Sequence, residues 1–369
     1  MALPGSGAIA LSDIADEFGG STPHSMSEYY SGGLGPSEVP ASGAISFSDF
    51  YGTSSVPDWA GSRSMYAGGY TTAYSNVVQT KTVASTSNLT DYGDLVYGRG
   101  THGSLSSQTY MFSAGGYGAS GASNMIDRKV FASNANATDR ADLQSETQYN
   151  NPSGVSNGSR GCWGHGYQTW LSNNSPNYGY IRNIKYMTLP DGTYASNFGI
   201  LNSYRSSSSG HGGDTRGVWG GGQAHQNVPG GSGKIDAIDY ITIATTGNAT
   251  DFGDLAATTA YLGSCGSTTR IVFGGGVDNT NYSINTLQYI TVASTGNTTD
   301  FGDFYSAIKY YNIQGCGDGS KGEFMGGWTN WPNGRTNRTH YITISSTGNS
   351  NANGNLLAGN DQGECASGI

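Results

Sequence analysis

The chain has 369 residues, including 59 glycines and 25 tyrosines, and its charged residues amount to only 12% of the total. An average soluble protein is about one quarter charged, so this composition is unusually neutral. The 11% of aromatic residues argue against disorder, and the glycines lack the three-residue period of collagen. The net charge of −9 comes without a basic cluster, which argues against nucleic acid as a partner. Together these features predict a turn-rich, tyrosine-rich β protein.

The N-terminal residues Met1–Asp13 contain no basic segment and no apolar stretch long enough for a signal peptide. The chain also lacks a run of about 20 apolar residues that could form a membrane span. Its four cysteines are too few for a disulfide framework in a chain of this length. We therefore expect a soluble protein that is made in a reducing compartment and does not insert into a membrane.

Residues 1–55 are predicted to form a separate N-terminal module. The sequence Ser6–Ile14 recurs as Ser42–Phe50, and Met26–Tyr29 between them repeats the same order of apolar, serine, acidic and apolar residues. Ser25 has capping-box spacing to the glutamate three residues later, which predicts short helices. A segment of this size is not expected to bury a core of its own. We therefore expect it to dock onto another protein through apolar residues, namely Ile9, Leu11, Ile14, Met26, Tyr29, Ile45, Phe47 and Phe50.

Residues 56–369 contain six copies of a unit of about 50 residues. The clearest copy of the shared segment reads Asn-Ala-Thr-Asp-Phe-Gly-Asp-Leu at Asn248–Leu255. Related segments lie at Asn88–Leu95, Asn136–Leu143, Ser196–Leu201, Asn297–Phe304 and Asn349–Leu356. The Asn and Asp residues predict a turn in which side-chain oxygens accept nearby backbone N–H groups. The final apolar residue is predicted to be buried, and Ala141 is expected to have a negative φ where the other copies have glycine.

Two further elements recur in each unit. An alternating run such as Asp239–Ala244 predicts a half-buried strand, and an aromatic residue before a glycine doublet, as in Phe273–Gly276, predicts a second strand. A repeat of this length with room for four strands predicts a propeller blade, whose glycines fit the crowded channel side. We therefore expect an all-β fold, a six-bladed β-propeller over residues 56–369, with seven blades as the alternative. The end segment Gly363–Ile369 matches segments that lie between earlier units, so an end strand could close the ring.

The glycine-doublet strand at this period resembles the kelch family of propellers. The Ser-Gly-Ala-Ile module, followed by repeats such as Tyr240–Leu255, resembles virion structural proteins of tailed phages, particularly marine and cyanobacterial phages. This resemblance covers nearly the whole chain. It implies a virion location in which a kelch-like propeller faces outward from a tail or fibre and residues 1–55 bind other virion proteins. It also implies that the protein could form homo-oligomers in the particle.

Residues with chemical potential recur without forming a recognisable catalytic or metal site. Aspartate pairs such as Asp251 and Asp254 supply two carboxylates per turn, whereas Ca²⁺ takes about six to eight oxygen ligands. Cys265, Cys316 and Cys365 are predicted to occupy one position in successive blades as small buried residues. The six histidines have neither metal-ligand spacing nor a triad partner. We therefore expect no enzyme activity, no metal and no cofactor, with a polysaccharide depolymerase as a less favoured alternative.

The loops after the glycine doublets differ between units and are the predicted binding regions. They contain four aromatic candidates for contact with a sugar or a protein, namely Tyr167, Trp170, Trp328 and Trp331. Packing of these aromatics against neighbouring blades is an equally favoured explanation. The main hypothesis is therefore a phage structural protein. Its alternatives are a receptor-binding or carbohydrate-binding module for host adsorption and a capsid decoration protein.

Overall fold

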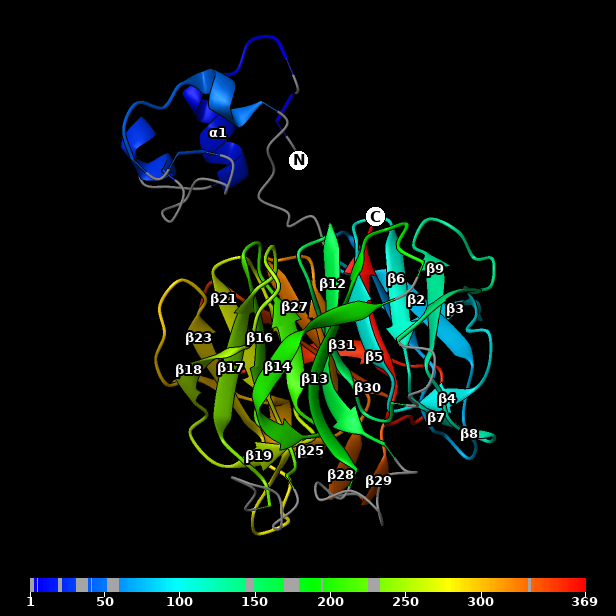
Figure 1. Cartoon of the computed structure of the whole chain (residues 1–369). Helices are drawn as coiled ribbons and strands as arrows, with labels where there is room; N and C mark the ends of the chain where they lie inside the picture. Colours follow the sequence, from blue (N-terminus) through cyan, green and yellow to red (C-terminus); the bar gives the residue numbers. More distant parts are fainter. Residues whose placement is uncertain are drawn as a thin grey trace. The chain divides into compact units, whose positions relative to one another are not determined.

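A computed structural model of the chain describes residues 3–4, 6–18, 22–30, 39–40, 42–51, 60–143, 149–168, 179–193, 195–224, 233–330 and 333–369. It is nearly all β and divides into two compact units, unit 1 (Met1–Pro57) and unit 2 (Asp58–Ile369) (Figure 1). Within the described ranges, none of the helices is long and apolar enough to cross a membrane.

The described residues of unit 1 form three short helices, namely α1 (Leu11–Phe18) and the 3-10 helices Met26–Tyr29 and Phe47–Phe50. The backbone N–H of Ser25 donates to Glu28 Oε1 at 2.8 Å, which confirms the predicted capping box. The N–H of Ser46 donates to Asp49 Oδ2 at 2.7 Å in the same way. Each cap fixes the entry of one helical turn, so the repeated sequence pattern becomes a repeated local structure.

Unit 1 also has its own hydrophobic core, so the prediction that it cannot bury one is wrong. Ile14, Tyr29 and Phe50 are each fully buried, and Leu3 and Val39 complete the cluster. The Tyr29 and Phe50 rings pack edge to face with their centroids 6.2 Å apart. The core is possible because each helical turn points one large apolar side chain toward the same centre, which concentrates the little apolar area that the segment has.

Among the described residues, unit 2 holds six four-stranded antiparallel sheets, numbered here in chain order. Their strands are β32 (Glu364–Gly368), β1 (Arg63–Ala67), β2 (Val77–Thr82) and β3 (Thr90–Asp94) in sheet 1; β5 (Gly103–Ser106), β6 (Tyr110–Ala114), β9 (Met125–Val130) and β10 (Thr138–Asp142) in sheet 2; β11 (Ser153–Ser156), β12 (Arg160–Tyr167), β13 (Tyr180–Thr188) and β14 (Ser196–Arg205) in sheet 3; β15 (Ser209–Gly212), β16 (Arg216–Gly220), β17 (Ala237–Thr242) and β18 (Thr250–Asp254) in sheet 4; β20 (Gly263–Gly266), β21 (Arg270–Gly274), β23 (Thr286–Thr291) and β24 (Thr299–Asp303) in sheet 5; and β26 (Gln314–Gly317), β27 (Lys321–Met325), β30 (Arg338–Thr343) and β31 (Asn351–Asn355) in sheet 6.

Sheet 1 combines the two ends of unit 2. The C-terminal strand β32 pairs with β1 over five residues, from Arg63 opposite Gly368 to Ala67 opposite Glu364. The first strand of each sheet, in the order given above, also contacts the first strands of its two neighbours. These contacts run in the order β32, β5, β11, β15, β20, β26 and back to β32. The first strands are therefore the innermost strands of unit 2.

The Asn-x-Thr-Asp segment is not a turn as predicted, because its Thr-Asp part begins the fourth strand in four of the six sheets, namely β3, β10, β18 and β24. In sheet 4, Phe252 is only 2% exposed whereas Asp251 and Asp254 are exposed, so one large apolar side chain anchors the strand. A β-bulge gives the fourth strand one residue more than its partner strand in five sheets, namely in β3, β10, β18, β24 and β31. Turn-forming residue types are tolerated here because the strand is at the edge of its sheet.

In four of the six sheets, an asparagine before the fourth strand binds the preceding sheet. Asn297 Oδ1 accepts the backbone N–H of Asp254 at 3.0 Å, across 43 residues of sequence. The same contact recurs between equivalent residues of other neighbouring sheets, namely Asn136 with Asp94, Asn248 with Ile200 and Asn349 with Asp303. The repeated asparagine therefore joins neighbouring sheets.

Basic residues at the start of the second strands make another contact between sheets. Arg270 Nη1 donates to the carbonyl oxygen of Ile344 in the next sheet at 2.8 Å, while its guanidinium lies 4.3 Å from the ring centroid of Tyr289. Arg160 and Arg216 make the equivalent bonds at 3.0 and 2.6 Å. Much of the small basic content of the chain is therefore used to hold neighbouring sheets together.

The final apolar residue of each repeat is buried, as predicted, and its exposure does not exceed 4% at Leu95, Leu143, Leu201, Leu255, Phe304 and Leu356. Ala141 lies outside the left-handed region, which confirms its predicted negative φ, although its strand keeps the same bulge as the others. Gly253 and Gly302 have φ values of +144° and +146°. Gly199 is not among the glycines with positive φ, because β14 continues as a long strand through that residue.

Candidate binding face

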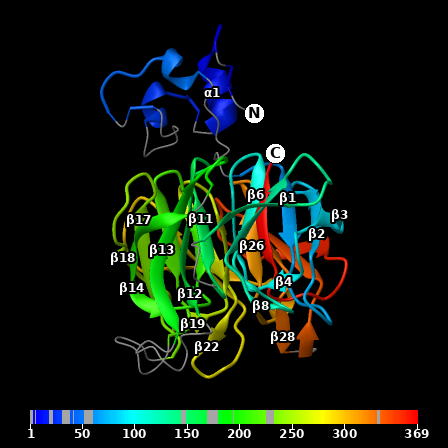
Figure 2. The ribbon, with the colours of Figure 1, turned by 45° about the vertical axis from the view of Figure 1, so that its right-hand side comes forward.

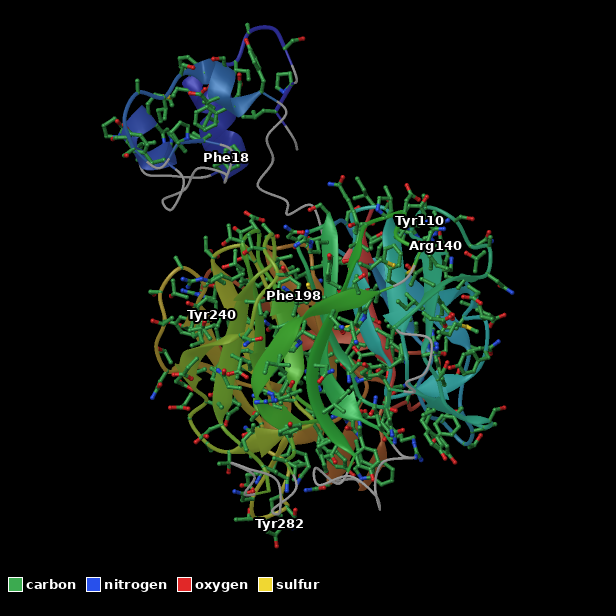
Figure 3. The ribbon with its side chains drawn as sticks, in the orientation of Figure 1. Phe18, Tyr110, Arg140, Phe198, Tyr240 and Tyr282 are labelled. Atoms are coloured by element: carbon green, nitrogen blue, oxygen red, sulfur yellow. The ribbon has the colours of Figure 1, made fainter. Side chains whose placement is uncertain are left out.

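One end of unit 2 carries additional small sheets built from the loops that vary between repeats. These are β4 (Arg99–Gly100), β7 (Tyr117–Gly118) and β8 (Gly121–Ala122); β19 (Thr259–Ala260) and β22 (Val277–Asp278); and β25 (Tyr310–Tyr311), β28 (Trp328–Asn330) and β29 (Asn333–Arg335). They lie at the lower end of unit 2 in Figures 1 and 2. We call this end the loop face. The opposite end, where the asparagine and arginine contacts between sheets lie, is called the clasp face; Figure 3 labels Tyr282 at the former and Tyr110 at the latter.

The glycine doublets mark the place where each second strand passes onto the loop face. Gly275 and Gly276 have φ values of +66° and +102°, and a Cβ on Gly276 would lie 2.8 Å from the carbonyl oxygen of Ala260. The backbone N–H of Gly276 donates to Tyr310 O at 2.7 Å. The prediction that these glycines avoid a collision with nearby backbone is confirmed. Their predicted location is wrong, because the glycines follow the second strand of their sheet and not the innermost strand. The backbone that they approach belongs to the segments between sheets.

Six residues at the loop-face end of the innermost strands have left-handed backbone although none is glycine. Each stands two positions before an innermost strand, and the six, called the mouth ring, are Thr101, Asn151, Ser207, Tyr261, Asn312 and Gln362, with φ between 52° and 63°. Backbone hydrogen bonds join four pairs of neighbouring mouth-ring residues. They include Thr101 N–H to Gln362 O at 2.7 Å and Asn312 N–H to Tyr261 O at 2.8 Å. Left-handed backbone costs a non-glycine residue about 1–2 kcal/mol. Such strain gathered around one opening is typical of a functional site.

The mouth ring borders a cavity of about 50 Å³ whose lining is mainly serine, asparagine and glutamine. Glu364 also lines it, and burial raises the pKa of its carboxyl well above the ordinary value. The amide of Gln314, oriented to donate, reaches the two carboxyl oxygens of Glu364 at 3.1 and 3.2 Å. This space accommodates a few water molecules and is too narrow for an organic ligand.

Ser208 and His165 form a buried pair beside this cavity. The Ser208 hydroxyl and His165 Nε2 are 2.5 Å apart. A serine next to a histidine is the arrangement of an activated nucleophile, but burial and the nearby Arg205 hold the pKa of His165 well below its usual value. The adjacent cavity has no room for a substrate, so we assign the pair to packing of the mouth.

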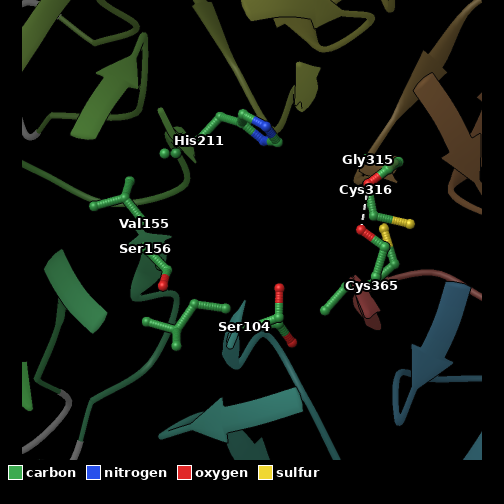
Figure 4. A pocket seen from close by; sticks show the side chains of 15 residues that line it. Ser104, Val155, Ser156, His211, Gly315, Cys316 and Cys365 are labelled. Carbon is green, nitrogen blue, oxygen red and sulfur yellow. Dashed lines mark hydrogen bonds between the residues drawn. The ribbon is translucent and has the colours of Figure 1, made fainter. Parts of the chain in front are cut away.

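A second cavity of about 50 Å³ lies deeper between the innermost strands (Figure 4). Its lining includes His211, Cys316 and Cys365, which come from three different sheets. The prediction that Cys365 shares a position with the other repeated cysteines is wrong. Cys265 and Cys316 lie opposite Val272 and Glu323, whereas Cys365 lies opposite Tyr66, one residue earlier in its strand.

All four cysteines are buried and free, and burial raises the thiol pKa of Cys162, Cys265 and Cys365. Buried thiols of raised pKa are poor nucleophiles and poor metal ligands. In the part of the chain that the structure describes, no group of three or more His, Cys, Asp and Glu residues is placed to hold a metal ion. The aspartate pairs of the repeats lie along single edge strands.

A row of aromatic rings in edge-on or tilted contact, joined by one arginine, crosses the loop face. Its members, called the aromatic row, are Tyr117, Tyr74, Tyr70, Arg335, Trp328 and Tyr311, all of them half-buried. The ring centroids of Tyr117 and Tyr74 are 6.0 Å apart, those of Tyr74 and Tyr70 are 5.0 Å apart, and those of Trp328 and Tyr311 are 6.3 Å apart. The Arg335 guanidinium lies 4.5 Å from the Tyr70 centroid and 5.0 Å from the Trp328 centroid. Four separate stretches of the chain thus contribute to one continuous surface.

Of the four predicted binding aromatics, Trp328 belongs to the aromatic row and Tyr167 lies at the end of β12. The Tyr167 ring packs on Tyr180 at 5.3 Å, and Trp170 and Trp331 lie outside the described residues. The other aromatic-row residues were missed by the sequence analysis. A signal for two of them was present, because Tyr70 and Tyr117 follow glycine doublets directly, as Trp328 does.

The eight predicted docking residues of unit 1 are not equivalent. Ile14, Tyr29 and Phe50 are fully buried in the core of unit 1, which excludes them as a contact surface and is a correction of their predicted role. Four others pack against that core while remaining partly exposed, namely Ile9, Leu11, Met26 and Ile45. Phe47 is 42% exposed and is the best placed of the eight for contact with a partner.

A comparison with protein-family models finds none that matches this chain, and a comparison with curated proteins finds no similar sequence. The function is therefore inferred from the geometry of the two units and from the repeat pattern.

Proposed function

We propose that unit 2 is a closed, kelch-like β-propeller of six blades and that the chain is a non-enzymatic structural protein of a tailed-phage virion. The cyclic contacts of the six innermost strands and the pairing of β32 with β1 support the closed ring. The resemblance of the repeats to phage virion proteins supports the location. In this proposal, unit 1 binds other virion proteins of the tail or fibre and the propeller faces outward.

The direction in which the chain enters unit 2 is the observation that carries the proposal. Strand β1 begins with Arg63 at the clasp face and runs to Ala67, after which Gly68 and Gly69 lead onto the loop face. The chain therefore enters unit 2 at the end opposite its variable loops. An attachment through the N-terminal side leaves the loop face free, which is the arrangement expected of a protein that presents a scaffold to the outside.

The use of charged groups supports a structural role over a catalytic one. Arg99 pairs with Asp127 at 3.1 Å and Arg205 with Asp239 at 3.0 Å, all four side chains being at most 1% exposed. Asp127 Oδ2 also accepts the backbone N–H of Val96 from the preceding sheet at 3.0 Å. These buried groups contact one another and the backbone of their own and neighbouring sheets, which supports a structural role.

The proposal is tested by the exchange Phe47→Asp in the phage that encodes this chain. We expect the variant protein to fold, because Phe47 is exposed, and to be absent from purified particles. Tyr282→Ser on the loop face is the matched control, since Tyr282 is 65% exposed, and it should enter particles normally. Absence of the wild-type protein from purified particles, measured by mass spectrometry, would overturn the virion location; normal incorporation of Phe47→Asp would overturn the role of unit 1.

A further inference from the structure

The aromatic row is held rigidly although it lies at the surface. Arg335 is stacked between Tyr70 and Trp328, and its Nε donates to Asp361 Oδ1 at 2.6 Å. Asp361 is only 2% exposed, and its backbone also bonds that of Tyr70. The rings therefore have fixed orientations before any partner arrives, which lowers the entropy cost of binding.

The aromatic row is also electrically neutral. Among its described members Arg335 is the one charged group, and Asp361 compensates that charge at contact distance. Nucleic acid and acidic polymers are bound through uncompensated cations, which this surface lacks. The row consists of five half-buried tyrosine and tryptophan rings and one paired arginine, and it contains no aliphatic side chain.

Neutral hydrogen-bonding groups border the row. Tyr311 directly precedes the mouth-ring residue Asn312, and Asp361 directly precedes Gln362. Gln362 Nε2 donates to Asp361 Oδ2 at 3.4 Å, which places one amide of the mouth ring beside the partner of Arg335, on backbone held by the bonds around the ring. Flat aromatic faces beside neutral amides and hydroxyls match the two kinds of surface on a sugar, its C–H faces and its hydroxyl edge.

We propose that the aromatic row and the adjoining mouth ring bind a neutral polysaccharide chain. Successive groups of the row are 4.5–6.3 Å apart, so the row extends over several rings and suits an oligosaccharide segment better than a single sugar. The inference needs only the loop face and stands independently of the virion location.

Affinity electrophoresis of the full-length protein provides the test. The probes are neutral polysaccharides (dextran, mannan, galactan and xylan), with alginate and a sulfated galactan as acidic counterparts. We expect at least one neutral probe to retard the wild-type protein, with a dissociation constant that is unchanged between about 0.1 and 1 M salt, because no counterions are released. Trp328→Ala and Tyr117→Ala should each weaken that binding at least tenfold, while Trp328→Phe retains most of it.

Tyr282→Ala is the control, because Tyr282 is on the loop face outside the row, and thermal melts of every variant establish that it is folded. Equal retardation of Trp328→Ala, Tyr117→Ala and wild type would overturn the proposal. So would retardation by acidic probes alone, or by none of the neutral probes. Release of reducing ends from a bound polysaccharide would contradict the non-enzymatic role and leave the binding site intact.

Discussion

His102 illustrates how a single residue departs from the repeat. It follows the mouth-ring residue Thr101, and the equivalent positions in sheets 5 and 6 hold Leu262 and Ile313. His102 is fully buried, and neither of its ring nitrogens has a hydrogen-bond partner among the described residues. Burial and the nearby Arg99 hold its pKa well below the usual value, so the imidazole is neutral. A polar ring stands here where sheets 5 and 6 have an apolar side chain.

Replacing His102 by leucine should therefore stabilise the protein. An unsatisfied buried polar group costs about 1–3 kcal/mol, and leucine is the residue that the same fold accepts at Leu262. We expect the free energy of unfolding in urea at pH 7 to rise within that range. A lower stability of His102→Leu would contradict the assignment and indicate a polar partner for the imidazole.

Stability should also fall in mild acid, because burial lowers the pKa of four histidines. His102, His165, His211 and His340 are all affected, and the values for His211 and His340 are about 4. In the unfolded chain histidine titrates near pH 6.5, so between about pH 6.5 and 4 the unfolded state binds more protons and the native state loses stability. Glu364 acts in the opposite direction, since its raised pKa makes the native state bind a proton more strongly as the pH falls. Thermal melts from pH 7 to pH 5 should show a smaller decrease for His102→Leu than for wild type; equal decreases would contradict the role of His102.

At the scale of elements, the sequence pattern predicted some strands correctly and predicted a turn where another strand forms, for a physical reason. The alternating run of β17 and the glycine doublets were recognisable because their signals are local. The segment of β18 was misread as a turn because Asn, Thr, Asp and Gly are turn residues in isolation. Its strand conformation comes from Phe252, which enters the core, and from Asn248, which binds the preceding sheet. Those partners lie outside any local window.

The same limit applies to the candidate site. Trp328 and Tyr167 could be selected from their variable loops. The contact of Arg335 with Tyr70 and Trp328, however, joins residues from the beginning and the end of the unit 2 sequence. No spacing in the sequence indicates that contact. The mouth ring was equally hidden, because left-handed backbone at residues such as Tyr261 has no signature in residue type.

Leu255 and Asp254, at the end of the outer strand β18, allow the contribution of a buried apolar side chain to stability to be compared with that of an exposed carboxylate. Leu255 is 4% exposed and packs in the core of sheet 4, whereas the neighbouring Asp254 side chain is exposed. Leu255→Ala should cost about 2–5 kcal/mol as a core deletion, and Asp254→Ala about 1 kcal/mol or less. Both are measured by denaturant unfolding. Equal losses would mean that the aspartates act as ion ligands, and adding Ca²⁺ to the wild-type protein would then raise its unfolding midpoint.

At the scale of the whole molecule, the junction of sheets 1 and 6 differs from the others because it joins the two ends of unit 2. Lys81 Nζ lies 3.0 Å from Glu323 Oε1, and the two side chains are at most 1% exposed. Asn353 Nδ2 donates to the same carboxylate oxygen at 2.6 Å, and Lys81 Nζ also donates to Asn353 O at 2.9 Å. A buried ion pair of this kind fixes register more than it adds stability. It can form only after the last sheet has been made.

The ion pair between Lys81 and Glu323 therefore provides a test of the closed ring. Glu323→Ala leaves the Lys81 ammonium buried without its counterion, which should cost about 3–5 kcal/mol of unfolding free energy in urea. Asp191→Asn is the matched control, because Asp191 is 80% exposed and its pairs with Arg128 and Arg140 should contribute about 1 kcal/mol or less. The double variant Lys81→Met with Glu323→Leu should recover most of the loss, since an apolar pair of similar volume removes both buried charges. If Glu323→Ala were no more damaging than Asp191→Asn, sheets 1 and 6 would not be joined in solution and the proposed ring would be open.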